Sequence, residues 1–167
     1  MFKTWWRKRL LNKLYTFNKA SLVYLPENKY KHVFVFGSNL LGKHFGGAAA
    51  VAKYLYDAQS GVAQGPTGNC YAIPTMDSSF QPLELLVIGG FVMEFKKEAA
   101  ANPDVTYHLT PIGCGIAGYK PYDIAPMFLE CPKNVILPIE FQELFLNEWF
   151  WYEAYFKEEI ANAKRPK

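Results

Sequence analysis

The hydrophobic pattern of the chain is organised around one short stretch. Four apolar residues, Val33 to Phe36, run without a polar break and stop at Gly37. A run of this length, rich in valine and phenylalanine, predicts a strand buried on both faces, as in a parallel sheet. Glycines follow, and then residues 48–55, which favour a helix. The pattern therefore predicts a strand, a glycine-rich turn and a helix in succession.

The rest of the chain alternates between strand-like and helix-like patterns. Loop composition over 61–69 precedes a strand at 70–73, which is expected to end at Pro74. A long helix is predicted from Pro82 to Asn102, with an apolar stripe at Leu85, Ile88, Val92 and Phe95. Gly89–Gly90 within it suggests a close backbone contact. A strand at 105–110, a short helix at 122–129 and a last strand at 134–137 follow. This alternation predicts an α/β fold with a mixed or parallel sheet flanked by helices.

Both ends of the chain show aromatic patterns at helical spacing. Residues 2–19 carry an apolar stripe with Lys and Arg between its members, and a short strand is predicted at 21–25. Residues 140–160 carry a second aromatic stripe whose charges are mostly acidic. The predicted organisation is a helical extension at 1–20, an α/β domain at 21–138 and a C-terminal helix at 139–167. Mutual packing or homo-oligomerisation through these helices is favoured over contact with a membrane surface.

Composition and charge exclude several classes of protein for this chain. The chain has 167 residues, of which 50% are hydrophobic and 20% charged, so one globular domain is expected. Residues 1–31 hold eight basic residues and one acid, whereas the remainder holds ten basic and fourteen acidic residues. This asymmetry does not suit a uniformly basic surface for a specific nucleic acid. No apolar run approaches the roughly 18 residues of a membrane span, and no signal peptide is recognised.

Cysteine usage indicates a reducing, cytoplasmic setting. Cys70, Cys114 and Cys131 stand singly and are odd in number. That arrangement favours neither a disulfide framework nor a zinc site. We expect no metal and no resident cofactor.

Two glycine-rich loops are the strongest candidates for ligand binding. The first spans 37–47 and the second spans 113–118, and each follows a predicted strand and precedes a predicted helix. Free amides at a helix N-terminus favour an anion, so a phosphate-bearing ligand is one interpretation. Tight turns with glycines for geometry alone are the other. Two such loops at one edge of a sheet suit an extended ligand with a central diphosphate. Neither loop fits a P-loop or a dinucleotide-binding fingerprint.

Three segments in order carry a resemblance to a known family. They are 36–40 with 46–49, 71–75 with Asp77, and 111–119 with 123–126. This succession resembles macrodomains, which bind ADP-ribose, and is most similar to a macrodomain-like group frequent in bacteriophages and bacteria. The likeness covers roughly residues 32–138. It implies a macrodomain-like sheet flanked by helices and an ADP-ribose-type nucleotide as ligand, in the host cytoplasm if the protein is phage-encoded.

The resemblance also implies roles for particular residues. Asn39 would lie near the distal ribose, Gly46 and Gly47 beside that sugar, and residues 113–118 around the diphosphate. Related enzymes that remove ADP-ribose from glutamate carry a lysine after the second strand and an aspartate inside the second loop. Met76 and Ala117 take those positions here, which argues against that hydrolase chemistry. An acidic adenine contact has no match, and stacking by Tyr or Phe could replace it.

The predicted ligand contacts lie in the two loops and at the end of the second strand. They are Gly37, Ser38, Asn39, Leu40, Gly42, Gly46, Gly47, Ala48, Thr75, Gly113, Cys114, Gly115, Ile116, Ala117, Gly118 and Tyr119.

Catalysis is a second hypothesis and rests on His44 and Asp77. An imidazole in the first loop and a carboxylate after the second strand could act as acid and base on an ADP-ribosyl or ADP-ribose-phosphate substrate. Alternatively, His44 is a surface loop residue and Asp77 caps a turn. Cys114 is better explained as a small packing residue than as a nucleophile. A third hypothesis is a structural or assembly protein with a vestigial pocket.

Overall fold

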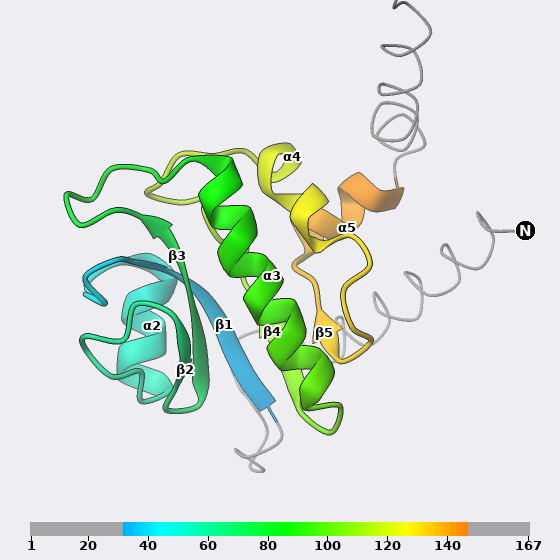
Figure 1. Cartoon of the computed structure of the whole chain (residues 1–167), viewed down its shortest axis with the longest axis horizontal. Coiled ribbons are helices and arrows are strands. Elements are labelled where there is room, and N and C mark those ends of the chain that lie inside the picture. The colour runs from blue at the N-terminus through cyan, green and yellow to red at the C-terminus, as the bar shows by residue number, and fades with distance from the viewer. Residues whose placement is uncertain (1–31, 147–167) are drawn as a thin grey trace, which may run out of the picture.

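A computed structural model describes residues 32–146 of the chain. Its centre is a five-stranded sheet in the order β2-β3-β1-β4-β5 (Figure 1). The strands are β1 (His32–Asn39), β2 (Gly65–Thr67), β3 (Cys70–Met76), β4 (Thr106–Leu109) and β5 (Val135–Ile136). Neighbouring strands are parallel except β2, which runs antiparallel to β3. The described residues therefore form an α/β fold with a mixed, mostly parallel sheet, as the alternating pattern predicted.

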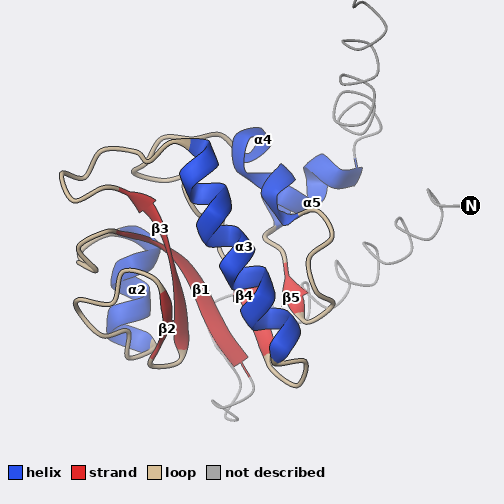
Figure 2. Ribbon diagram, viewed as in Figure 1, coloured by secondary structure: helices blue, strands red, loops and turns tan. Residues whose placement is uncertain are grey.

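Helices cover both faces of this sheet (Figure 2). They are α2 (Gly47–Leu55), α3 (Leu85–Ala101), α4 (Pro121–Ile124), the 3₁₀ helix η2 (Ala125–Phe128) and α5 (Ile139–Leu146). Helix α2 packs on one face, and α3, α4, η2 and α5 belong to the core on the other. No helix within residues 32–146 has the length and hydrophobicity needed to cross a membrane.

Strand β1 is the central strand, between β3 and β4, and both of its faces are covered. Successive side chains of a strand point to opposite faces, so Val35 enters the α3-side core and Phe36 the α2-side core. Both residues are fully buried. The prediction from the unbroken apolar run at 33–36 is therefore confirmed.

Helix α3 confirms the predicted apolar stripe. Ile88, Val92 and Phe95 are buried as predicted, Leu85 is half-buried against the same core, and Ala99 extends the stripe. The helix ends before Asn102, as predicted. The close contact expected at Gly89–Gly90 was wrong. A Cβ built on either glycine meets nothing within 4 Å, because this pair faces away from the sheet.

Two segments differ from the prediction around β3. The expected loop at 61–69 contains strand β2, and β3 continues through Pro74 to Met76. Strand β2 pairs with β3 only at Cys70–Ala72, so no neighbour on that side requires an N–H from Pro74. The chain then crosses back through the Met76–Pro82 bridge, and α3 begins at Leu85 instead of Pro82.

Only a small part of the predicted terminal helices falls within the described residues. Phe141 and Phe145 of α5 are buried in the α3-side core, so residues 139–146 pack against the α/β unit. The predicted helix at 2–19 and strand at 21–25 lie outside the described residues, as does most of the predicted helix at 140–160.

Candidate functional site

Three loops emerge at the same edge of the sheet. Strands β1, β3 and β4 are parallel, so their carboxyl ends share one rim, from which the loops 40–46, 77–84 and 110–120 leave (Figure 1). Ligands in open α/β sheets bind outside such ends. The two glycine-rich loops therefore lie where a shared ligand would need them.

The two glycine-rich loops also come into contact. A Cβ built on Gly37 would lie 3.6 Å from the Gly113 nitrogen, and one built on Gly46 would lie 3.4 Å from Ile116 Cδ1. The end of β1 is thus adjacent to the start of the second loop, and the start of α2 is adjacent to its middle. Residues that are 70 or more positions apart in the sequence therefore form one surface.

Asn39 fixes the shape of the first loop. Its Oδ1 accepts hydrogen bonds from the amides of Leu41 (3.2 Å) and Lys43 (3.1 Å), and its Nδ2 donates to the Lys43 carbonyl (2.6 Å). The side chain is buried, with 3% exposed. Asn39 therefore organises the turn itself, and one N–H of its amide remains for another acceptor.

Ser38 and Thr75 are also turned into the protein. The Ser38 hydroxyl donates to the Ala63 carbonyl, and the Thr75 hydroxyl donates to the Ser38 carbonyl at 3.3 Å. Both side chains are buried. These two predicted ligand residues hold β1 against its neighbours in the structure.

The N-terminus of α2 offers uncapped amides beside the second loop. The first hydrogen bond of the helix runs from the Ala50 amide to the Gly46 carbonyl (3.2 Å), and no side chain caps the helix. The amides of Gly47, Ala48 and Ala49 therefore have no acceptor among the described residues. Such a helix end carries partial positive charge and suits an anion.

The second loop presents three more amides in succession. Its internal hydrogen bonds run from the Gly118 amide to Gly115 (3.0 Å) and from the Tyr119 amide to Gly113 (3.0 Å). The amides of Gly115, Ile116 and Ala117 have no acceptor within the described part of the chain. Consecutive free amides form an anion-binding concavity. Tyr119 connects this loop to the segment before α3, because its hydroxyl donates a hydrogen bond to the Leu83 carbonyl at 2.6 Å.

Apolar side chains surround these amides and face solvent. Phe45 and Ile116 are 72% and 73% exposed, and Leu40 is 43% exposed. The Lys53 ammonium lies 5.5 Å from the centre of the Phe45 ring, which places a cation beside this rim. The combination of polar backbone and exposed apolar side chains is typical of binding surfaces.

His44 does not lie on this exposed surface. Its side chain is fully buried, with its ring edge-on to Phe36 at 5.0 Å between centroids. Burial lowers the pKa of the imidazole, opposed by the backbone of Gln59 and Val62 and aided by Lys53. The backbone of Gln59 and Val62 acts on the ring, but neither ring nitrogen has a partner of standard hydrogen-bond geometry among residues 32–146. The interpretation of His44 as a surface loop residue was therefore wrong.

Asp77 caps the turn that follows β3. Its Oδ1 accepts hydrogen bonds from the amides of Ser79 (2.8 Å) and Gln81 (2.9 Å). This is the capping alternative that the sequence offered. No hydrogen bond, ion pair or ring contact joins Asp77 to His44 in the described structure.

The cysteines are thiols and do not form a metal site. Burial, with smaller contributions from Glu140 and Asp123, raises the pKa of Cys114 to about 11. Burial also raises the pKa of Cys70 to about 12. Neither is a thiolate at neutral pH, so neither is an activated nucleophile. Within residues 32–146, no group of three His, Cys, Asp or Glu residues could hold a metal ion.

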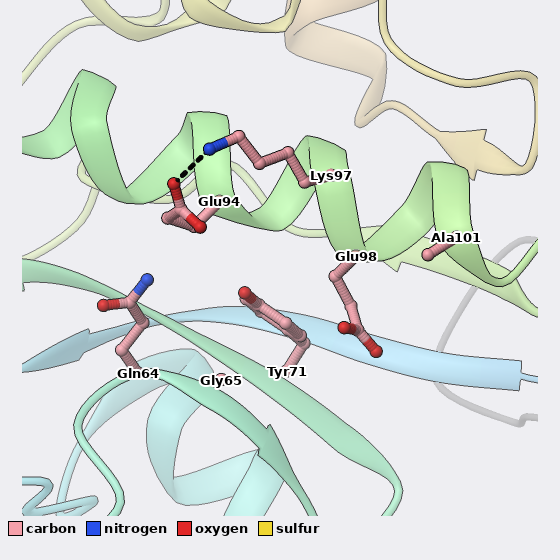
Figure 3. A pocket seen from close by; sticks show the side chains of 7 residues that line it. All are labelled: Gln64, Gly65, Tyr71, Glu94, Lys97, Glu98 and Ala101. Carbon is pink, nitrogen blue, oxygen red and sulfur yellow. Dashed lines mark hydrogen bonds and ion pairs between the residues drawn. The ribbon is translucent and has the colours of Figure 1, made fainter.

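A cavity lies away from the two loops, between α3 and the edge of the sheet formed by β2 and β3. It measures about 560 Å³ and is lined by Gln64, Gly65, Tyr71, Glu94, Lys97, Glu98 and Ala101 (Figure 3). None of the predicted ligand residues lines it. The sequence reasoning missed this cavity, although Glu94 and Glu98, one helical turn apart, were a signal within the predicted helix.

In comparisons with known proteins, no family model, curated protein or solved structure matches this chain.

Proposed function

We propose that this protein is a macrodomain-like binding module for ADP-ribose or a related nucleotide, with the diphosphate held by the two glycine-rich loops. The observation that carries the proposal is the meeting of two sets of unpartnered amides at one rim. Residues 47–49 at the start of α2 and residues 115–117 of the second loop provide these amides. Gly46 and Ile116 place them side by side. A diphosphate has two anionic groups and matches two adjacent cradles.

The surroundings of the amides support a ligand with flat and apolar parts. Phe45 and Ile116 are largely exposed beside the cradles, so either side chain can cover a nucleobase or a ribose. The resemblance in the first loop, the second strand and the second loop provides the choice of ADP-ribose among such ligands. Stacking on an aromatic ring would replace the acidic adenine contact that this chain lacks.

A hydrolase that uses His44 and Asp77 has no comparable support. The imidazole is enclosed beneath the first loop, and the carboxylate is occupied by the turn at 77–81. A general acid or base must reach the reacting atoms directly or through one water molecule. We therefore favour binding over hydrolysis.

Calorimetric titration with ADP-ribose, ADP and AMP tests the proposal. We expect saturable heat with ADP-ribose and ADP and much weaker binding of AMP, which lacks the second phosphate. The key variant is Gly46→Asp. Gly46 is the N-cap of α2 with extended backbone (φ −143°), which any residue can adopt, so an aspartate there would accept hydrogen bonds from the free amides.

Gly46→Ala is the matched control for this variant. It adds the same Cβ, 3.4 Å from the flexible end of Ile116, without the carboxylate. We expect Gly46→Asp to weaken ADP-ribose binding by more than about tenfold, because hydrogen bonds to a charged group are lost and like charges repel. Gly46→Ala should retain most of the affinity. Absence of heat at high micromolar protein, or equal affinity of both variants, would overturn the proposal.

A further inference from the structure

We propose that the cavity between α3 and the β2–β3 edge is a second binding site, specific for a small organic cation that carries an ammonium or guanidinium group on a short aliphatic chain. The site is independent of the proposed nucleotide-binding loops. Figure 3 shows its two walls: Gln64 and Tyr71 on the sheet side, and Glu94, Lys97 and Glu98 on α3.

The first argument is a tyrosine hydroxyl that faces the cavity. Tyr71 is 96% buried, since only 4% of it is exposed, and its ring packs against Phe95 at 5.1 Å between centroids. The side chain of Gln64, on the same wall of the cavity, acts on its hydroxyl as a hydrogen-bond partner. The hydroxyl points into the cavity, where a ligand can also contact it (Figure 3).

The second argument is the charge of the lining. The Lys97 ammonium is already paired with Glu94 at 2.7 Å. One oxygen of Glu98 accepts a hydrogen bond from Asn102 Nδ2 at 3.1 Å, and its other oxygen has no partner within residues 32–146. The lining thus has two carboxylates and one ammonium. A net negative charge remains beside the hydroxyl of Tyr71 and favours a cation.

The pKa values of Tyr71 and Tyr107 are raised in part by the same carboxylates. Burial raises the pKa of Tyr71, and Glu98 and then Glu94 raise it further, while Gln64 lowers it. Burial, Glu98 and Tyr71 raise the pKa of Tyr107 to about 12. Tyr71 is therefore a neutral phenol at physiological pH, able to donate to or accept from a ligand.

Size and wall chemistry identify the cation as an organic molecule. A volume of about 560 Å³ far exceeds one metal ion and lies in the range of small-molecule sites, roughly 300–1,000 Å³. The described residues provide no third metal-binding side chain here. The ring of Tyr71, the methyl group of Ala101 and the stems of the charged residues form apolar walls that suit an aliphatic chain.

Titration of the full chain with agmatine and with putrescine, at constant ionic strength, tests this site. We expect saturable binding of both, with tetramethylammonium, which has no N–H donor, binding far more weakly. Glu98→Gln should weaken agmatine binding by about tenfold, because a charged hydrogen bond is lost. Glu84→Gln is the matched control. It removes the same charge from an exposed position at the other end of α3, and its affinity should equal that of the wild type.

Two further variants sharpen the test. Tyr71→Phe should weaken binding several-fold and change the urea unfolding midpoint little, because the hydroxyl faces the cavity and has only the side chain of Gln64 as a partner among the described residues. Lys97→Gln should strengthen binding by about threefold, because it frees the carboxylate of Glu94. Lys53→Gln, with the same charge change on the opposite face, should not.

The proposal is overturned if neither agmatine nor putrescine binds saturably. It is also overturned if Glu98→Gln and Glu84→Gln have equal effects, which would indicate diffuse attraction to an acidic surface. ADP-ribose affinity should be the same in the wild type and in Glu98→Gln, so the two proposals can fail separately.

Discussion

The two faces of the sheet are covered by different types of buried residue. On the α3 side, aromatic rings form a connected series: Phe95 contacts Tyr71, Tyr107 and Phe128, and Phe128 contacts Phe141, with centroids 5.1–6.4 Å apart. On the α2 side, the buried residues are Phe36, Tyr56, Cys70 and four alanines: Ala49, Ala52, Ala58 and Ala72. That side also carries the buried polar residues Ser38 and His44 beneath the first loop.

The α3 side therefore contributes most of the apolar burial, whereas the α2 side determines the backbone conformation of the first glycine-rich loop. Large apolar side chains stabilise the α3 side in proportion to the area they bury. Small side chains on the α2 side let backbone segments approach closely, as where the Gly61 amide donates to the Gly42 carbonyl at 2.9 Å. The α2 side therefore depends on backbone conformation, and it is the side that positions the first glycine-rich loop.

The largest effect is expected from the α3 side. Phe95→Ala removes a fully buried ring that joins three other aromatic residues. We expect it to lower the free energy of unfolding by about 4 kcal/mol, through lost apolar burial and a residual cavity. Urea unfolding followed by circular dichroism measures this. Met93→Ala, on the same helix with 59% of its side chain exposed, should change stability little. Similar losses in both variants would contradict the comparison.

The next effect tests backbone shape on the α2 side. Gly42 has a left-handed backbone (φ +64°), and a Cβ there would lie 2.4 Å from the Gly61 carbonyl carbon. Gly42→Ala should cost about 3 kcal/mol, because it adds strain and forces two backbone segments apart. Gly61→Ala is the control, with φ +92° but open space around its Cβ, and should cost less. Amide hydrogen exchange of residues 40–62 would localise the change.

Acid should weaken the α2 side specifically. His108 alternates with Tyr107 and Leu109, so it lies on the face opposite the α3-side core, and its ring nitrogen is 2.8 Å from that of His32. Burial, together with His32, lowers the pKa of His108 to about 4. Between pH 6.5 and pH 4 the unfolded chain binds more protons than the folded chain does. The contribution of His108 to the free energy of unfolding is therefore fully present above pH 6.5 and decreases as the pH is lowered toward 4.

At pH 5 the loss from His108 amounts to about 2 kcal/mol. The pKa of His44 is also lowered by burial, so its contribution has the same sign. Urea unfolding at pH 7.5 and pH 5 should show a smaller difference for His108→Gln than for the wild type. Equal differences for the two proteins would remove His108 as a source of acid sensitivity.

The smallest effect concerns the candidate site itself. Gly46→Asp should raise the free energy of unfolding by about 1 kcal/mol, because the aspartate accepts a hydrogen bond from the free amide of Ala48 or Ala49 in α2. Gly46→Ala lacks the carboxylate and should not stabilise the protein. A thermal unfolding scan of both variants decides this. A stabilised variant with weakened ADP-ribose binding would show that the open helix end is retained for a ligand.

Local patterns were enough to predict the frame of the fold. The unbroken run at 33–36 predicted a doubly buried strand, and the stripe from Leu85 to Phe95 predicted one face of α3. Because parallel strands place their carboxyl ends together, the shared rim of the two glycine-rich loops followed from the same patterns. These features depend on residues close in sequence.

Contacts between distant segments could not be predicted in this way. His44 lies in a glycine-rich loop, which usually indicates exposure, but residues 59–62 pack against this loop because Gly42 has no side chain to keep them away. Strand β2 contains Gly65 and Pro66, which are poor strand formers, and exists because β3 provides a partner. The cavity requires Tyr71 and Glu98 to face each other across two elements, which no single segment encodes.

The two edges of the described sheet have a consequence for behaviour in concentrated solution. One edge is β2, three residues long with Pro66 at its centre, and the other is β5, only two residues long. A strand from another molecule needs a continuous row of N–H and C=O groups to add to, and neither edge provides one. The apolar run 33–36, rich in valine and phenylalanine, is enclosed at the middle of the sheet. We therefore expect the folded protein to resist fibril formation, and the unfolded chain to be the species from which aggregates grow.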